Sequence, residues 1–251
     1  MTRMALTAVL MLLCAPAGAA EVKVISAGAV RGIIAGMIDD YSRQTGVKFN
    51  FTVGPTGLLR KVIAAGEPAD LIIASSGLMA ELEGTGKMTP GSRTDLGRIG
   101  LGLVVRAGAR APDISTPEAF KQALIDAQSI AYTDPAAGGV SYLHLMALAE
   151  RFGIKDAVIK KGVHATGGND AVAKVAQGKA EIAVTLISEI HDPGARLAAP
   201  LPPALQNYTL YAAAIPAAST DPAAARAFVA ALTSPALAER WKAAGFEPPG
   251  K

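Results

Sequence analysis

Cysteine is nearly absent from this chain. Of 251 residues only Cys14 carries a thiol, and it lies in an apolar segment close to the start. If that segment is removed, no thiol remains. Disulfide bonds, thiol catalysis and cysteine-ligated zinc are then excluded, because each requires a cysteine side chain.

Histidine is also scarce, and the numbers of basic and acidic residues are nearly equal. The three histidines do not recur at the helical spacing of metal ligands, so we expect neither a metal site nor a cofactor. Lys and Arg number 24 against 21 Asp and Glu, and the two signs are interspersed, which gives nucleic-acid binding no support. With 51% hydrophobic residues, the composition is typical of a packed globular protein.

The first twenty residues have the pattern of a secretory signal peptide. Arg3 supplies the positive charge, residues 5–14 are apolar apart from Thr7, and residues 17–20 are small. The apolar run is too short to span a membrane, so we expect cleavage rather than stable membrane insertion. Cleavage at about residue 20 removes Cys14 and lowers the formal net charge of +3 by one.

Strand and helix patterns alternate along the rest of the chain. Such alternation predicts an α/β protein with largely parallel sheets, because βαβ units pair parallel strands through helical crossovers. Two halves of this kind in an exported chain favour a solute-binding architecture with a cleft between two lobes. The expected strands cover residues 22–26, 47–53, 70–74, 99–105, 130–133, 182–186 and 208–215, and the expected helices cover 31–42, 58–65, 117–127, 141–152, 170–177, 222–232 and 235–244, with a proline-rich connection over 193–203.

Several short motifs occur in an order that resembles a known family. They are residues 24–30 (VISAGAV), 54–57 (GPTG), 66–71 (GEPADL), 134–135 (DP), 168–169 (GN) and 177–180 (QGKA). Together they resemble the periplasmic molybdate-binding group of ABC-transporter solute receptors. The resemblance implies a monomer with the type II periplasmic-binding-protein fold, a small anionic ligand and an ABC permease as partner. It assigns residues 21–105 and 190–251 to lobe one and residues 106–189 to lobe two.

The cleft of such a fold is suited to an anion. Loops at the carboxyl ends of parallel strands converge there, and each leads into a helix whose first N–H groups are unpaired. Glycines at these turns let the backbone approach a bound oxygen closely. The residues expected to bind the ligand are Ala29, Arg31, Thr56, Gly57, Gly138, Gly139, Ser141, Asn169 and Asp170, with Ser141 also expected to cap the helix that it begins.

The chain departs from the molybdate-binding pattern at two of three hydroxyl positions. The resemblance implies a serine, a Ser or Thr, and a tyrosine; here these positions hold Ala29, Thr56 and Leu186. Two lost donors would cost about 1 to 3 kcal/mol each in oxyanion binding. Arg31, which follows the first turn, offers a guanidinium that matches a carboxylate. We therefore expect a di- or tricarboxylate rather than molybdate.

Two functions remain open at this point. One is capture of the anion for ABC-type uptake in the periplasm. The other is isomerisation, because the group that the chain resembles includes the periplasmic enzyme aconitate isomerase, whose reaction needs cations and a base. His144 lies within an apolar helix and is expected to pack there. Candidate bases are Tyr142, His164, Asp170 and Glu189. The sequence does not identify which of them would be the base, and capture is the default role of this fold. We therefore favour capture.

Overall fold

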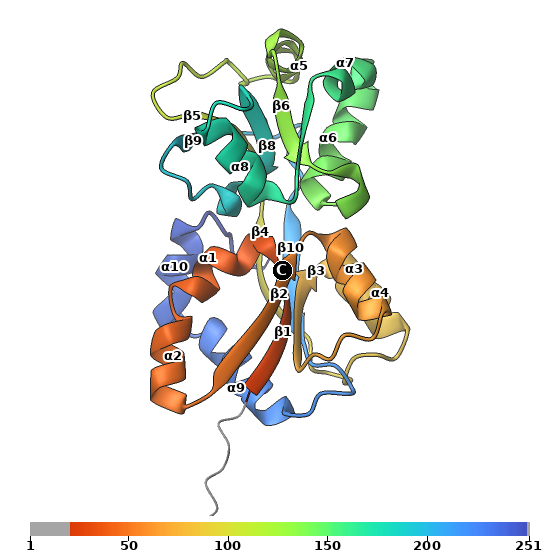
Figure 1. Ribbon diagram of the computed structural model, residues 1–251, viewed down its shortest axis with the longest axis vertical. Coiled ribbons are helices and arrows are strands. Elements are labelled where there is room, and N and C mark those ends of the chain that lie inside the picture. The colour runs from red at the N-terminus through yellow and green to blue at the C-terminus, as the bar shows by residue number, and fades with distance from the viewer. Residues whose placement is uncertain (1–20, 250–251) are drawn as a thin grey trace, which may run out of the picture.

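Two mixed β-sheets of five strands each form the frame of the molecule (Figure 1). The computed structural model describes residues 21–249, so the expected signal peptide lies outside the described residues. Sheet one has the strand order β2 (Lys48–Gly54), β1 (Glu21–Ala27), β3 (Leu71–Ser75), β10 (Thr209–Ala214), β4 (Thr94–Ile99), and sheet two has the order β7 (Gly162–Ala165), β6 (Ile130–Thr133), β8 (Ile182–Leu186), β5 (Leu101–Arg106), β9 (Ala195–Pro200).

Each sheet has one strand that runs against the other four. In sheet one, β1 pairs parallel with β2 and β3, while β10 is antiparallel to β3 and β4. In sheet two, β6 pairs parallel with β7 and β8, while β5 is antiparallel to β8 and β9. The strands β3, β6 and β8 are buried along their whole length, as parallel strands covered on both faces are. The predicted α/β class is confirmed.

Helices cover both faces of each sheet. In Figure 1, α3 and α4 lie on one side of sheet one and α1, α2 and α10 on the other, while α8 and α6 flank sheet two. Within residues 21–249, no helix is long and apolar enough to cross a membrane. The helices are η1 (Gly28–Val30), α1 (Arg31–Ala35), α2 (Ile38–Thr45), α3 (Thr56–Ala64), α4 (Ser76–Gly84), α5 (Pro117–Asp126), η2 (Pro135–Ala137), α6 (Val140–Arg151), α7 (Lys155–Lys160), α8 (Gly168–Ala176), η3 (Ile187–Glu189), α9 (Pro222–Leu232), η4 (Pro235–Leu237) and α10 (Ala238–Ala243).

The chain passes between the sheets twice, at one place in space. It leaves sheet one after β4 and enters sheet two at β5, with only Gly100 between them. On the return path, the Gln206 side chain donates to the carbonyl of Leu101 and accepts from its N–H, at 2.9 and 2.7 Å. Because β5 and β9 pair within sheet two, the chain changes sheets near residues 100 and 201–208, and the lobe boundaries at 105 and 190 stay a prediction.

The helix expected over residues 31–42 is two helices, α1 and α2. They are separated at Gly36 and Met37, where the Met37 N–H bonds the carbonyl of Ile34 in a tighter turn. The guanidinium of Arg240 in α10 donates to the carbonyl of Gly36. A long-range partner thus takes a carbonyl that a continuous helix would have used, which the local pattern of apolar residues does not reveal.

One buried carboxylate ties the C-terminal part of the chain to sheet one. Asp70, just before β3, is 2% exposed. Its Oδ2 accepts from the Lys23 N–H, and its Oδ1 accepts from the Ser219 hydroxyl, the Thr220 hydroxyl and N–H, and the Asp221 N–H. Burial raises the pKa of Asp70, but these hydrogen bonds to the ionised form outweigh burial, and its pKa is lower than usual.

We expect Asp70→Ala to lower the free energy of unfolding by about 3 to 4 kcal/mol, because it leaves several buried donors unpaired. Urea denaturation measures this, and Asp126→Ala, an exposed change, should alter stability by less than about 0.5 kcal/mol. A depressed carboxyl pKa stabilises the fold above its unfolded value, and that contribution is lost as pH falls through the folded pKa. The difference between wild type and Asp70→Ala should therefore shrink in acid; a constant difference would contradict this role.

Candidate functional site

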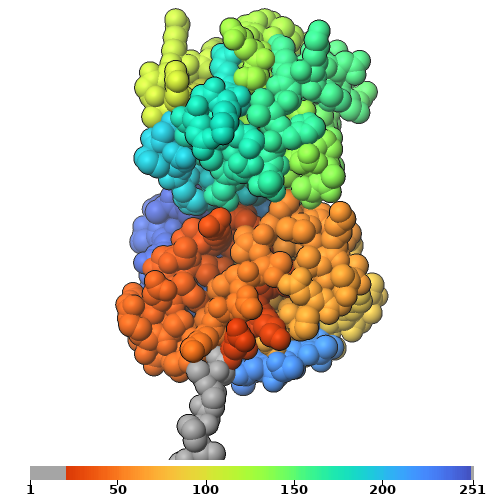
Figure 2. All heavy atoms as spheres, in the orientation of Figure 1, coloured from red at the N-terminus to blue at the C-terminus, as the bar shows by residue number. Residues whose placement is uncertain are grey.

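A small cavity lies between the two sheets. Its volume is about 200 Å³, below the roughly 300 to 1,000 Å³ of pockets for drug-sized ligands, so it fits a small molecule. The space-filling view shows the two halves of the molecule meeting at this level (Figure 2). Strand-to-helix turns of both halves form most of its wall. The lining residues are Ala27, Gly28, Ala29, Arg31, Val53, Gly54, Pro55, Thr56, Thr133, Gly139, Val140, Ser141, Thr166, Gly167, Gly168, Asn169, Asp170, Leu186, Glu189 and Tyr211.

Three helices begin at the cavity wall with open N-termini. The residues at the N-cap positions of α3, α6 and α8 are Pro55, Gly139 and Gly167, and within residues 21–249 no side chain caps these helices. By contrast, the side chains of Thr116 and Asp221 cap α5 and α9. The first N–H groups of α3, α6 and α8 therefore remain for a ligand, and the helix dipoles make that end favourable for negative charge.

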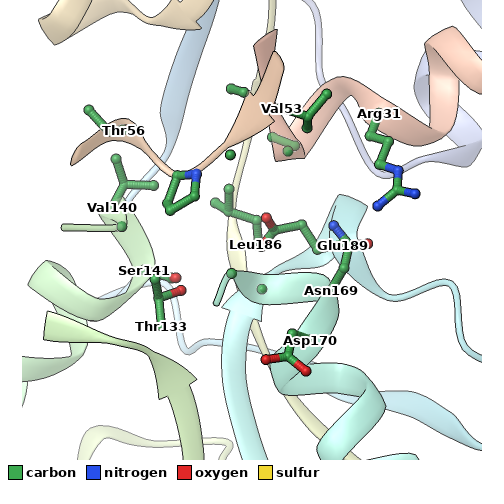
Figure 3. A pocket seen from close by; sticks show the side chains of 18 of the residues that line it. Arg31, Val53, Thr56, Thr133, Val140, Ser141, Asn169, Asp170, Leu186 and Glu189 are labelled. Atoms are coloured by element: carbon green, nitrogen blue, oxygen red, sulfur yellow. The ribbon is translucent and has the colours of Figure 1, made fainter. Parts of the chain in front are cut away.

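Hydroxyl groups from both halves add polar groups to the cavity wall. Figure 3 shows Ser141 and Thr133 in sheet two's half of the cavity, with Thr56 on the opposite wall. Ser141 was predicted to cap its helix, but that prediction is wrong: α6 begins at Val140, and Gly139 holds the cap position. Since Ser141 lies inside the first turn, its buried side chain lines the cavity instead of closing the helix end.

A buried carboxyl group, Glu189, is the most unusual member of the lining. It is 8% exposed and lies in η3, directly after β8. The Thr185 hydroxyl donates to its Oε2 at 2.5 Å. Burial raises the pKa of Glu189, and the hydrogen bond from Thr185 only partly opposes this. Glu189, one of the four candidate bases, is thus a cavity-lining carboxyl whose pKa is higher than usual.

Tyr211 faces Glu189 from the other sheet. It belongs to β10, is buried, and lines the cavity. Burial and the nearby charge of Glu189 both raise the pKa of the Tyr211 phenol, so the group stays neutral. Tyr211 was not among the predicted site residues, because the position of a tyrosine in a strand pattern does not indicate which cavity it faces. Its position followed only from the pairing of β10 with β3.

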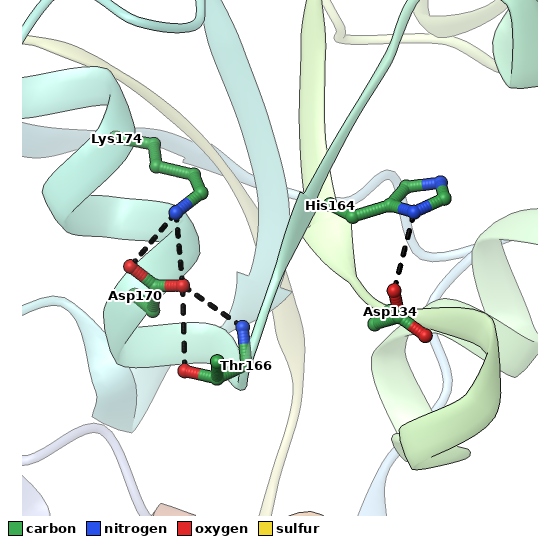
Figure 4. A network of polar contacts seen from close by, with 5 residues as sticks. All are labelled: Asp134, His164, Thr166, Asp170 and Lys174. Atoms are coloured by element: carbon green, nitrogen blue, oxygen red, sulfur yellow. Dashed lines mark hydrogen bonds and ion pairs between the residues drawn. The ribbon is translucent and has the colours of Figure 1, made fainter.

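Asp170 lines the same cavity but is already engaged. Its carboxylate accepts from the N–H and the hydroxyl of Thr166 and pairs with the ammonium group of Lys174 at 3.0 Å (Figure 4). Burial raises the pKa of Asp170, but these contacts outweigh burial and lower it overall. Asp170 therefore anchors the start of α8 and is a poor base. Asn169 lies close to Glu189, since a Cβ on Gly28 would be within 4 Å of both side chains, and the exposed Arg31 is seen on the same side, at the right of Figure 3.

The other candidate bases lie away from the cavity. His164 is exposed, and its Nδ1 is 3.2 Å from Oδ2 of Asp134, at a neighbouring groove (Figure 4). Tyr142 packs against Tyr132, with ring centroids 5.6 Å apart. The ring of His144 bonds the carbonyl of Leu205 at 2.7 Å, which agrees with its predicted packing role.

Gly57 and Gly138 lie at a contact between the two halves rather than in the cavity wall. A side chain at Gly57 would place its Cβ 2.3 Å from the carbonyl oxygen of Ala137. Gly138 adopts φ +58°, a conformation that favours glycine, and its own Cβ would face Gly57. On another side of the junction, the ring of His191 lies against Gly32. The halves therefore touch at separate places around the junction.

Known proteins match this chain over most of its length. Residues 22–247 match the family described as bacterial extracellular solute-binding protein. An aconitate isomerase from a Pseudomonas species is 33% identical over 209 residues, which are 81% of this chain and 78% of that protein.

Solved structures of binding proteins have the same fold. The periplasmic molybdate-binding protein of Azotobacter vinelandii has a TM-score of 0.76 at 22% identity, covering 91% of this chain and all of that chain. The sulfate-binding protein of Mycobacterium tuberculosis has a TM-score of 0.69 at 18% identity, covering 91% of this chain and 87% of that chain. The predicted type II periplasmic-binding-protein fold is confirmed.

Proposed function

The chain belongs to the bacterial extracellular solute-binding protein family, and we propose that it is an enzyme on this fold, an isomerase that interconverts cis- and trans-aconitate. The observation that carries the proposal is Glu189, a buried carboxyl with a raised pKa in a cavity built for an anion. A relative 33% identical to this chain is an aconitate isomerase. Simple capture, which the sequence favoured for want of a base, does not explain why a binding cavity would retain such a group.

The reaction needs one group that removes and returns a proton. Ionised Glu189 takes a proton from the CH2 carbon of trans-aconitate, the C–H electrons form a new double bond to the central carbon, and the electron pair of the old double bond moves to its far carbon. That carbon then takes a proton, so a C–H bond breaks at one carbon and forms at another with no net change. A carboxylate whose pKa is raised by burial is a stronger base than one in water, which suits it to this step.

Negative charge moves onto the substrate carboxylates as the proton leaves. The open N-termini of α6 and α8 present fixed N–H donors to that charge, and the Ser141 hydroxyl lies beside them. Preorganised donors of this kind stabilise a developing anion more than they stabilise the ground state. Arg31 supplies the guanidinium for a further carboxylate at the rim.

Deuterium incorporation tests the proposal directly. The protein is incubated with trans-aconitate in deuterated buffer, and the mixture is followed by proton NMR. We expect cis-aconitate that carries deuterium at its methylene carbon. If trans-aconitate binds but is recovered unchanged and unlabelled, the enzyme proposal is wrong.

Capture for transport is the second candidate function. The solved structures with this fold include binding proteins for molybdate and sulfate, and the cavity of this chain is lined by residues of both halves. In that case a carboxylate ligand would pass to an ABC permease chemically unchanged. Recovery of bound but unlabelled aconitate in the preceding experiment would support this candidate.

Both candidate functions imply that the protein is exported. Members of this family are extracellular or periplasmic, and we propose that residues 1–20 direct the chain to the periplasm and are then removed.

Replacing Arg31 should weaken ligand binding. We expect Arg31→Ala to raise the dissociation constant for trans-aconitate about tenfold to hundredfold, because a charge-assisted contact is worth about 1.5 to 3 kcal/mol. Titration calorimetry measures this. Arg60→Ala is the matched control, since Arg60 is an exposed arginine of α3 that pairs with Glu81 of α4 and does not line the cavity. Equal affinities of Arg31→Ala and Arg60→Ala for trans-aconitate would show that Arg31 does not bind the ligand.

A further inference from the structure

Thr185 and Glu189 form a buried pair beneath the first turn of α8. Thr185 is 1% exposed and lies near the end of β8, and Glu189 follows in η3. The hydroxyl of Thr185 donates to Oε2 of Glu189. Thr185 thus fixes one carboxyl oxygen of Glu189 from β8, a strand that is buried along its whole length.

Glycines on both sides leave room for this carboxyl. A Cβ on Gly168, the first residue of α8, would lie 1.7 Å from Oε2 of Glu189 and 2.2 Å from the Thr185 hydroxyl. A Cβ on Gly28, from the other half, would lie 3.3 Å from Oε1. The two oxygens therefore have different surroundings: Oε2 is held between Thr185 and Gly168, and Oε1 points toward Gly28, which lines the cavity.

We propose that Thr185 is a positioning residue, which holds Oε2 of Glu189 and leaves Oε1 as the oxygen that exchanges the proton with the substrate. The inference rests on the proposed isomerase function and adds a residue to it. Thr185 is not among the residues that line the cavity, so it acts through Glu189.

The charged and titratable groups around Glu189 come from three elements. Tyr211 faces it from β10, Asp170 and the amide Asn169 belong to α8, and Arg31 follows η1. Asp170 is paired with Lys174, and Tyr211 stays neutral because its pKa is raised. The Thr185 hydroxyl is thus a neutral donor that favours the ionised carboxyl without adding charge beside an anionic substrate.

Two substitutions separate positioning from simple packing. Thr185→Val keeps the shape of the side chain and removes the donor, and Thr185→Ser keeps the donor. We expect Thr185→Val to lower kcat about tenfold or more with little change in KM, and to move the acidic limb of the kcat profile to higher pH, because losing the donor raises the pKa of Glu189. Thr185→Ser should restore most of both properties. An unchanged kcat and pH profile in Thr185→Val would overturn the inference.

A second measurement keeps this test independent of the isomerase activity. The carboxyl carbon of Glu189 is titrated by 13C NMR in the ligand-free wild type and in Thr185→Val, and its signal is assigned by its loss in Glu189→Gln. We expect a higher pKa in Thr185→Val. If the wild type has no isomerase activity, the proposed function fails, and an upward shift still supports the contact as the one that tunes Glu189. An unshifted titration overturns the role of Thr185 whatever the activity.

Discussion

Glu189→Gln should abolish most of the isomerisation while leaving aconitate binding nearly intact. We expect kcat to fall about a thousandfold, within the 10² to 10⁴ that a general base contributes, because the amide cannot accept the allylic proton. The dissociation constant should change only a few-fold or improve, since the amide removes a negative charge that faces the anionic ligand. Single-turnover kinetics and titration calorimetry measure the two quantities separately.

The stability of the same variant provides its control. A buried carboxyl whose folded pKa is raised lowers the free energy of unfolding as pH rises from the unfolded pKa to the folded pKa, and this loss remains at higher pH. At neutral pH, Glu189→Gln should therefore be at least as stable as the wild type, so lost activity cannot come from unfolding. Glu181→Gln, at an exposed glutamate, should keep full activity. A Glu189→Gln variant with wild-type kcat would exclude Glu189 as the base.

The sequence predicted the cavity walls better than it predicted the base. Ala29, Thr56, Ser141 and Asn169 were expected at strand-to-helix turns, and all four line the cavity. Turns of this kind can be predicted from local sequence, because apolar strands end at small or polar residues that begin helices. Whether these residues touch a ligand stays a prediction.

The polar groups inside the cavity depend on contacts that are distant in sequence. Glu189 was one of four candidate bases, and its burial beneath Gly168 and its place in the cavity wall distinguish it from the exposed His164. Tyr211 reaches the cavity through the pairing of β10 with β3, across more than a hundred residues. Burial and long-range pairing set both the pKa and the orientation of a group, and no local pattern reports them.

The expected strand over residues 99–105 corresponds mainly to β5, with its first residue in β4, whereas the expected connection over 193–203 contains a strand that was not predicted. Both segments belong to the junction between the sheets: one apolar run is divided between β4 and β5, and the proline-rich stretch contains β9. An apolar run shows that a strand is buried but not in which sheet. Pro200 ends β9, which lies at the edge of sheet two, where a missing N–H is tolerated.

Gly57→Ala should prevent the two halves from closing on a ligand. The added Cβ would lie 2.3 Å from the carbonyl oxygen of Ala137, a backbone atom that cannot rotate away. We expect the two halves to separate to relieve this clash. If the closed form falls below about 1% of the population, the apparent affinity for trans-aconitate falls at least about a hundredfold, because affinity scales with the fraction of binding-competent protein. Titration calorimetry measures the loss, and small-angle X-ray scattering should show that ligand no longer compacts the molecule.

Gly77→Ala is the matched control for this change. Gly77 and Gly57 are each the second residue of a helix in sheet one's half, α4 and α3, but a Cβ on Gly77 would have no atom within 4 Å. Both substitutions should stabilise their helix by up to about 1 kcal/mol, since alanine forms helix better than glycine. Only Gly57→Ala should lose affinity, so a ligand-free protein that melts no earlier than wild type yet binds poorly identifies blocked closure. Wild-type affinity in Gly57→Ala would mean that the contact between Gly57 and Ala137 is not needed for binding.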